Sequence, residues 1–181
     1  MNKTEIRLAG SGGQGVILAS VIIAEAAVLS GEYAVQSQSY GPEARGGVCR
    51  AEVIVDDEEI DYPKVREADF LLALTQSSFD KYSVSAADDA VIIVDSDIDT
   101  TAYTATGKSV ISAPILYTAS DVLHKPMTAN IVSLGVVNGT LHLFDNKTLM
   151  KAILMHVPKG TEEVNMKAFY AGLELTGNGE A

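Results

Sequence analysis

A cluster of glycines near the amino terminus carries the clearest chemical signal in this sequence. Gly10, Gly12 and Gly15 are spaced as G-x-G-x-x-G between a short alternating segment and a long apolar run. A glycine turn exposes main-chain N–H groups, and a helix starting behind it adds unpaired donors and a positive dipole end. We therefore expect an anion-binding turn with phosphate as the favoured ligand, although the spacing also suits a purely structural turn. The candidate contacts are Gly10, Ser11, Gly12, Gly13, Gln14 and Gly15.

A second loop contains a guanidinium group among residues that shape the main chain. Pro42 restricts φ, Gly46-Gly47 allows close approach to the backbone, and Arg45 offers a planar fork suited to carboxylate or phosphate. If the strands before the two loops are parallel neighbours, both loops lie at one sheet edge, with Arg45 near Gly12. A surface pair between Arg45 and Glu43 is the equally weighted alternative. The candidate contacts in this loop are Glu43, Arg45, Gly46 and Gly47.

Two nucleotide-binding patterns fit these loops poorly. Dinucleotide binding requires an acidic residue near the end of the second strand. That strand ends Gln36-Ser37-Gln38-Ser39-Tyr40, and no acid follows until Glu43. A P-loop requires Gly-Lys-Ser/Thr, which does not follow the glycine cluster. A nicotinamide-dependent dehydrogenase is therefore the weakest of the functional hypotheses.

Metal and nucleophilic chemistry have little support in the sequence. The single cysteine, Cys49, cannot form an intrachain disulfide or a four-thiolate iron–sulfur or zinc site. It alternates within an expected strand, which is typical of a small buried residue. His124, His142 and His156 show no metal-ligand spacing. We predict no catalytic residue and no metal site in this chain.

The formal net charge of −11 is concentrated in one part of the chain. Residues 51–100 hold 14 acids against three bases, whereas 1–50 and 101–181 are each balanced. An acidic middle argues against nucleic acid as a partner. No apolar run reaches membrane-spanning length without a polar break, and Met1-Asn2-Lys3 leads directly into the first strand. We expect a cytoplasmic protein that binds neither membrane nor nucleic acid.

Hydrophobic periodicity predicts alternating strands and helices. The expected strands cover residues 4–9, 33–39, 48–55, 70–74, 91–94 and 109–113, and residues 60–62 are expected to return as a hairpin after the turn at Asp56. The expected helices cover residues 16–30, 75–82, 117–123, 128–137 and 145–156, with a last one beginning at Thr161. Asn138-Gly139 is expected to end the fourth of these helices.

These elements predict one domain over residues 1–181. Its fold class is α/β, a three-layer α/β/α domain with a mainly parallel sheet, an antiparallel hairpin and a Rossmann-like first βα unit. The helix over residues 16–30 carries only one charge, Glu25, and is apolar on every side. Such a helix is normally buried on every side, so either other helices of this chain or another subunit must cover it.

Three segments together resemble a known family. They are Gly-Ser-Gly-Gly-Gln-Gly-Val at 10–16, Gln-Ser-Gln-Ser-Tyr-Gly-Pro-Glu-Ala-Arg-Gly-Gly at 36–47 and Glu-Ile-Asp-Tyr-Pro at 59–63. Combined, they resemble the gamma subunit of the 2-oxoacid:ferredoxin oxidoreductases over most of the chain. The middle segment is most similar to the 2-oxoglutarate branch. The resemblance implies a single gamma-type domain of the pyruvate/ketoisovalerate ferredoxin oxidoreductases.

The resemblance also implies an activity, cofactors and partners. The family oxidatively decarboxylates a 2-oxoacid with coenzyme A, giving acyl-CoA, carbon dioxide and reduced ferredoxin, in anaerobic metabolism. Thiamine diphosphate, magnesium and iron–sulfur clusters belong to partner subunits: alpha and beta form the thiamine site, and a ferredoxin-like delta subunit or beta carries clusters. This chain would bind no cofactor alone, would contact coenzyme A in the complex, and would be inactive when isolated.

The expected role is therefore a non-catalytic subunit that positions coenzyme A and completes the wall of a site belonging to other chains. A free-standing nucleotide- or phosphate-binding module is the alternative, and a dehydrogenase is a weaker one. The sequence admits a homodimer of the isolated chain without requiring it, and it does not identify the 2-oxoacid.

Overall fold

The computed structural model describes residues 3–40 and 47–177. Six strands form one sheet: β1 (Thr4–Ser11), β2 (Tyr33–Tyr40), β3 (Val48–Asp56), β4 (Ala68–Ala73), β5 (Ala86–Asp95) and β6 (Ile111–Ala113). The helices are α1 (Val16–Leu29), α2 (Gln76–Tyr82), α3 (Thr101–Thr104), α4 (Ile115–Tyr117), α5 (Ala129–Leu141), α6 (Asn146–His156) and α7 (Glu162–Glu174). Short 3-10 turns cover Ser83–Ser85 and Pro126–Thr128, and a π-helical turn covers Thr118–Val122. No helix among the described residues is long and apolar enough to cross a membrane.

The strand order in the sheet is β2-β3-β1-β4-β5-β6. The pairs β1–β4, β4–β5 and β5–β6 are parallel, whereas β3 runs antiparallel to both of its neighbours, β1 and β2. The predicted α/β class is confirmed, and most of the expected elements are present. The expected hairpin after Asp56 is wrong, because residues 60–62 form no strand and β3 pairs with β1 and β2 instead.

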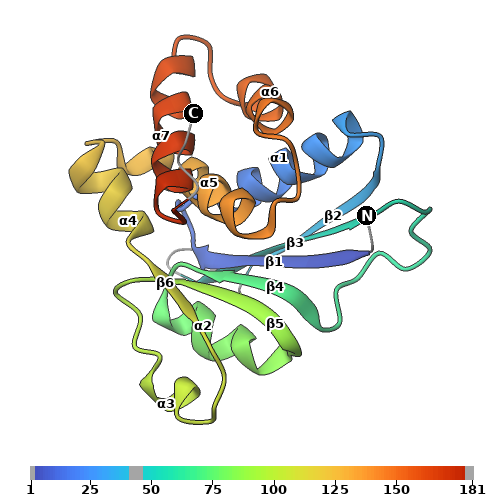
Figure 1. The fold of residues 1–181 in the computed structure, drawn as a ribbon, viewed down its shortest axis with the longest axis vertical. Helices are drawn as coiled ribbons and strands as arrows, with labels where there is room; N and C mark the ends of the chain where they lie inside the picture. The colour runs from blue at the N-terminus through green and yellow to red at the C-terminus, as the bar shows by residue number, and fades with distance from the viewer. Residues whose placement is uncertain (1–2, 41–46, 178–181) are drawn as a thin grey trace.

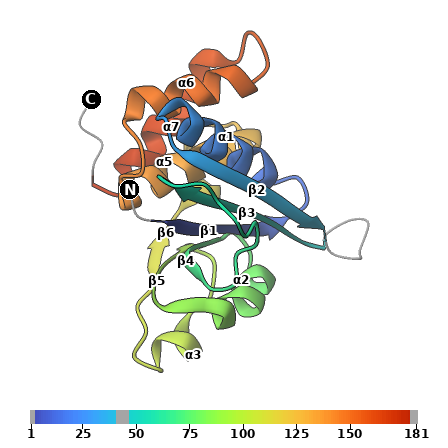
Figure 2. The ribbon, with the colours of Figure 1, turned by 90° about the vertical axis from the view of Figure 1, so that its right-hand side faces the viewer.

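Helices cover the two faces of the sheet unequally (Figures 1 and 2). α1, α5, α6 and α7 gather on one face, and the shorter α2 and α3 lie on the other, beside β4 and β5. Phe70 and Leu72 of β4 face the larger core, whereas Leu71 and Ala73 face the smaller one. Successive strand residues point to opposite faces, so a strand without polar alternation is buried on both.

The apolar helix α1 is covered by this chain itself. Its buried residues, which include Ile22, Ile23 and Ala26, pack with apolar side chains of the sheet and of the other helices on this face. Figure 1 shows α5 and α6 beside α1. Between the two alternatives left by the sequence, the structure supports the one in which the chain's own helices cover α1.

The end expected for the helix over residues 128–137 is also wrong. α5 continues through Asn138 and Gly139 to Leu141. The Asn138 side chain is buried and points to the next loop, where its Nδ2 donates to the Phe144 carbonyl and its Oδ1 accepts from the Phe144 N–H, each at 3.0 Å. Because the hydrogen bonds of the Asn138 amide are satisfied by tertiary contacts, the helix continues past it. These contacts override the local tendency of Asn-Gly to end a helix.

Candidate functional site

The turn between β1 and α1 has a left-handed main chain and a side chain folded back on it. Gly13 and Gly15 have φ values of 93° and 74°, which favour glycine. The Gln14 side chain bends over the turn, and its Oε1 accepts the Ser11 N–H at 2.7 Å. A Cβ at Gly10 would lie 2.5 Å from that oxygen, so Gly10 makes room for the amide. Ser11 and Gln14 therefore hold the turn in shape, and the Ser11 amide is not free for a ligand.

Three other main-chain N–H groups of the turn are free to bind a ligand. In the described part of the chain the N–H groups of Gly12, Gly13 and Gly15 have no hydrogen-bond partner. Both Gly12 and Gly13 are exposed, and a Cβ at either would meet nothing within 4 Å. α1 starts at Val16 without a side-chain cap and without an acidic residue in its first turn. Free amides at the positive end of a 14-residue helix suit an anion.

A buried amide side chain lies directly against this turn. A Cβ at Gly15 would come within 2.8 Å of Asn130 Cβ and Cγ, so α5 and the glycine turn touch at that point. Asn130 is only 5% exposed as a residue, but its side-chain amide is not among the buried polar atoms that lack a hydrogen-bond partner in the described part of the chain. Because Asn130 also lines a neighbouring groove, its amide is open to a ligand there.

Asn130 lines a groove of about 650 Å³, a size typical of a small-molecule site. The groove lies between the start of α1, the start of α5 and the start of α7. Its apolar wall is made by Leu18, Ile131, Val157, Pro158 and Val164, and its polar groups come from Lys125, Thr128, Asn130, Thr161 and Asn165. The Asn165 Nδ2 donates to the Thr161 carbonyl and hydroxyl oxygens, each at 2.9 Å. An apolar groove with amide side chains suits a flexible ligand that contains amide groups and ends in an anion.

The loop that follows β2 begins at the same edge of the sheet as the glycine turn, although β1 and β2 are not neighbours as the prediction supposed. β1 and β2 are not neighbours, because β3 lies between them, but both run in the same direction. Ser11 faces Val48 across the ladder, and Tyr40 faces Cys49, so the glycine turn and residue Gly47 lie at one edge. Gly41–Gly46, which include the predicted contacts Glu43, Arg45 and Gly46, lie outside the described residues.

The fold gives Cys49, Asp95 and His156 environments that do not indicate a catalytic role. Burial raises the pKa of the Cys49 thiol, which makes it a poor nucleophile. Asp95 accepts hydrogen bonds from the Leu116 and Asp97 amides and so fixes the end of β5. His156 lies 3.5 Å from Glu25 across α6 and α1, an ion-pair geometry that its sequence position did not predict. Among the described residues, no three histidine, cysteine or acidic side chains come together as metal ligands.

Sequence reasoning found the turn but not the groove. From the sequence, Asn130 is a polar interruption of the apolar helix predicted from Thr128, which could face a partner or bond inside the core. Sequence reasoning did not identify Asn165, because that residue lies on a predicted amphipathic helix with no motif around it. The available signal was the same in both cases: a polar side chain on a helix face that periodicity assigns to the core.

Comparisons with known proteins agree with this geometry. A family model described as pyruvate ferredoxin/flavodoxin oxidoreductase matches residues 5–175. The 2-oxoglutarate synthase subunit KorC of Methanocaldococcus jannaschii is 44% identical over 175 residues, covering 96% of this chain and 94% of the relative. Neither a free-standing phosphate-binding module nor a nicotinamide dehydrogenase is among these similarities.

Solved structures also share the fold. The gamma subunit of a keto/oxoacid ferredoxin oxidoreductase from Geobacter sulfurreducens is 41% identical, with a TM-score of 0.81 and coverage of 96% of this chain and 98% of that one. A 2-oxoglutarate:ferredoxin oxidoreductase from Magnetococcus marinus, described with 2-oxoglutarate, coenzyme A and succinyl-CoA bound, has a TM-score of 0.84 at 18% identity. The match covers 98% of this chain but 31% of that longer chain.

Proposed function

Because this chain belongs to the pyruvate ferredoxin/flavodoxin oxidoreductase family, we propose that it is the gamma subunit of a 2-oxoglutarate:ferredoxin oxidoreductase. The 44% identity over almost the whole of a 2-oxoglutarate synthase subunit supports this branch. The complex would convert 2-oxoglutarate and coenzyme A to succinyl-CoA and carbon dioxide in the cytoplasm, with reduction of ferredoxin. Alpha, beta and delta subunits would carry thiamine diphosphate, magnesium and iron–sulfur clusters.

The part proposed for this chain is to hold coenzyme A. The observation that supports it is the contact of Gly15, in a turn whose N–H groups at Gly12, Gly13 and Gly15 are free in the described part of the chain, with Asn130, which lines a largely apolar groove. Coenzyme A combines phosphates with a long arm that contains two amides. The glycine amides would take a phosphate, Asn130 would bond an amide of the arm, and Leu18 and Ile131 would pack against its methylenes.

Such binding would serve the reaction by position. When the arm of coenzyme A is bound, its thiol lies at a fixed distance from the site on the other subunits. The thiol then reacts without a separate collision in solution. The apolar wall of the groove would also keep water away from the thioester that forms. This chain would move no proton and form no covalent bond. Arg45, which the sequence places in the loop at the same edge, would pair with a second phosphate of the ligand.

Two substitutions test the site in the assembled complex. Gly12→Ala adds a methyl group where the chain leaves open space, so it should leave folding unchanged but block close approach of a phosphate. Asn130→Ala removes the side-chain amide. We expect each to raise the KM for coenzyme A about tenfold, as loss of a hydrogen bond to a charged or buried group does, with little change in the KM for 2-oxoglutarate.

The control is Thr140→Ala, a polar residue farther along α5 whose hydroxyl donates to the Val136 carbonyl. An unchanged KM for coenzyme A in both Gly12→Ala and Asn130→Ala would remove the proposed site. Arg45→Ala, measured in the same way, would show whether the second loop takes part. If the complex proved inactive with 2-oxoglutarate but active with another 2-oxoacid, the site would stand and the branch would be corrected.

A further inference from the structure

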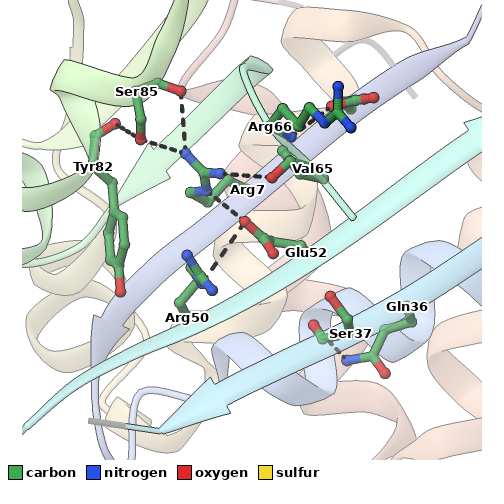
Figure 3. Close-up of polar contacts among 10 residues, drawn as sticks. Arg7, Gln36, Ser37, Arg50, Glu52, Val65, Arg66, Tyr82 and Ser85 are labelled. Carbon is green, nitrogen blue, oxygen red and sulfur yellow. Dashed lines mark hydrogen bonds and ion pairs between the residues drawn. The ribbon is translucent and has the colours of Figure 1, made fainter. Parts of the chain in front are cut away.

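A buried ion pair lies on the other face of the sheet, away from the groove. Arg7 of β1 and Glu52 of β3 face each other across the ladder, and Arg7 Nε lies 2.7 Å from Glu52 Oε1 (Figure 3). The remaining guanidinium nitrogens of Arg7 donate to Ser85 and to the Val65 carbonyl. The Glu52 charge is thus matched by Arg7, whose own nitrogens are all engaged.

A second arginine, Arg50, shares the Glu52 carboxylate with Arg7 as a longer ion pair. Arg50 Nε lies 3.7 Å from Glu52 Oε1, too far for a hydrogen bond, and it is buried with no acceptor. Neither Nη nitrogen has a partner in the described part of the chain. The Arg50 side chain is nevertheless 34% exposed, and its Cζ lies 5.5 Å from the centre of the Tyr82 ring. Stacking holds the guanidinium plane in place while its outer edge reaches solvent.

The surroundings of Arg50 add positive charge to an acidic protein. Lys81 Nζ lies 5.3 Å from the same Tyr82 ring, and no acid pairs with it among the described residues. With Arg7 and Glu52 cancelling, Arg50 and Lys81 leave a local excess of two positive charges, on a chain of net charge −11. A fixed guanidinium fork with free Nη groups binds a carboxylate through two parallel hydrogen bonds.

The shape of this surface favours a protein ligand over a small molecule. Arg50 lies on a strand in a part of the sheet where α1 covers the opposite face, and its neighbours on β2, Ser37 and Ser39, are half-buried or exposed. It does not line the groove at Asn130. Arginine stacked on tyrosine is a common anchor in protein interfaces. In the Magnetococcus protein the same fold is 31% of a longer chain, so this kind of domain is found joined to further protein.

We propose that Arg50 is a docking point that pairs with an aspartate or glutamate side chain of a partner subunit. This inference rests on the proposed function, because it presumes that the chain works inside a complex. It assigns the α2 face of β3 to the interface, whereas coenzyme A would lie on the α1 face. One sheet would then bind its small ligand on one side and its neighbour on the other.

The test compares the affinity of this chain for its partner subunits in wild type, Arg50→Gln and Arg50→Lys. We expect Arg50→Gln to raise the Kd about tenfold or more and to weaken its dependence on salt, because a charge pair across the interface is lost. Arg50→Lys should be intermediate, since it keeps the charge but not the planar fork. Arg66→Gln is the matched control, because Arg66 also stacks on a tyrosine, Tyr62, at 4.6 Å, but lies on an exposed loop.

A measurement on the unmutated chain removes any effect of altered folding. Phenylglyoxal labelling read by mass spectrometry should modify Arg50 in the isolated chain and spare it in the complex. A Kd within about twofold of wild type for Arg50→Gln, or equal labelling in both states, would overturn the proposal. Protection of Arg50 by 2-oxoglutarate or phosphate in the isolated chain would also overturn it, by assigning a small anion. If the wild-type chain did not assemble at all, the proposed function itself would fail instead.

Discussion

Arg50 and Glu32 each keep a polar atom without a hydrogen-bond partner in the described part of the chain. Asn130 opens toward the groove and Arg50 toward the α2 face of the sheet, and we assign each a ligand. Glu32 differs, because it directly follows the end of α1, where Gly31 turns the main chain with a φ of 86°. Its Oε2 is buried and unpaired, and it does not line the groove.

Glu32 predicts a pH effect on stability. Burial, with a smaller contribution from the Asp57 charge, raises the pKa of the Glu32 carboxyl above its ordinary value. The folded chain therefore holds this proton more tightly than the unfolded chain does. The resulting stability is complete below the unfolded pKa and is lost as the pH rises through the folded pKa. Glu32→Gln stays neutral and should be more stable than wild type at mildly alkaline pH.

Urea unfolding of wild type and Glu32→Gln across the range between mildly acidic and mildly alkaline pH measures this effect. The free energies of unfolding should diverge as the pH rises. Glu58→Gln, on the exposed turn after β3, is the control substitution. Parallel pH profiles for wild type and Glu32→Gln would mean that the carboxylate is solvated in the folded chain.

At the scale of elements, α5 and α7 make a very close contact. These helices meet at Gly135 and Gly172, whose missing side chains allow the two backbones to touch. A Cβ at Gly135 would lie 2.2 Å from the Phe169 carbonyl oxygen, and one at Gly172 would lie 2.1 Å from that of Val132. This crossing places the start of α5, with Asn130, beside the start of α7, and so shapes the groove.

Gly135→Ala should therefore destabilise the fold even though alanine favours helices. The methyl group must push two backbones apart, which costs about 1–3 kcal/mol in packed cores and would lower the Tm by roughly 2–4 °C per kcal/mol in a chain of this size. Thermal unfolding of the isolated chain measures it. Gly12→Ala is the control with no neighbour to displace, and its Tm should match wild type. A Gly135→Ala variant as stable as wild type would show that α5 and α7 slide apart at little cost.

At the scale of the whole molecule, the arrangement separates binding from reaction. We propose that the groove, the glycine amides and the stacked arginine hold other molecules. The Methanocaldococcus and Geobacter relatives carry the names of enzyme subunits. In the proposed function, this chain contributes surface and position to chemistry that partner subunits complete.

The isolated chain should accordingly convert nothing. We expect the purified protein to be colourless and to contain neither thiamine nor iron. Activity should appear only when the partner subunits are added, because they supply the thiamine and the clusters. Turnover of 2-oxoglutarate by this chain alone, or a tightly bound flavin or nicotinamide, would contradict the proposed division of labour.

The sequence by itself determined the local features. The glycine spacing located the β1–α1 turn, the alternation of β3 separated Cys49, Ala51 and Val53 from Arg50 and Glu52, and the apolar run of β4 identified a strand buried on both faces. Local features are predictable because each depends on a few adjacent residues and on a period of 2.0 or 3.6. The three motif segments also indicated the family, because residue types and their separation are properties of the chain alone.

Only the tertiary structure decided which distant groups meet. It inserted β3 between β1 and β2, covered α1 with helices of the same chain, and brought Asn130 against Gly15 and Arg50 against Tyr82. These contacts join residues tens of positions apart, and strand order and helix crossing fix them through packing of the whole core. A periodic pattern reports which face of an element is buried, but it does not name the neighbour that buries it.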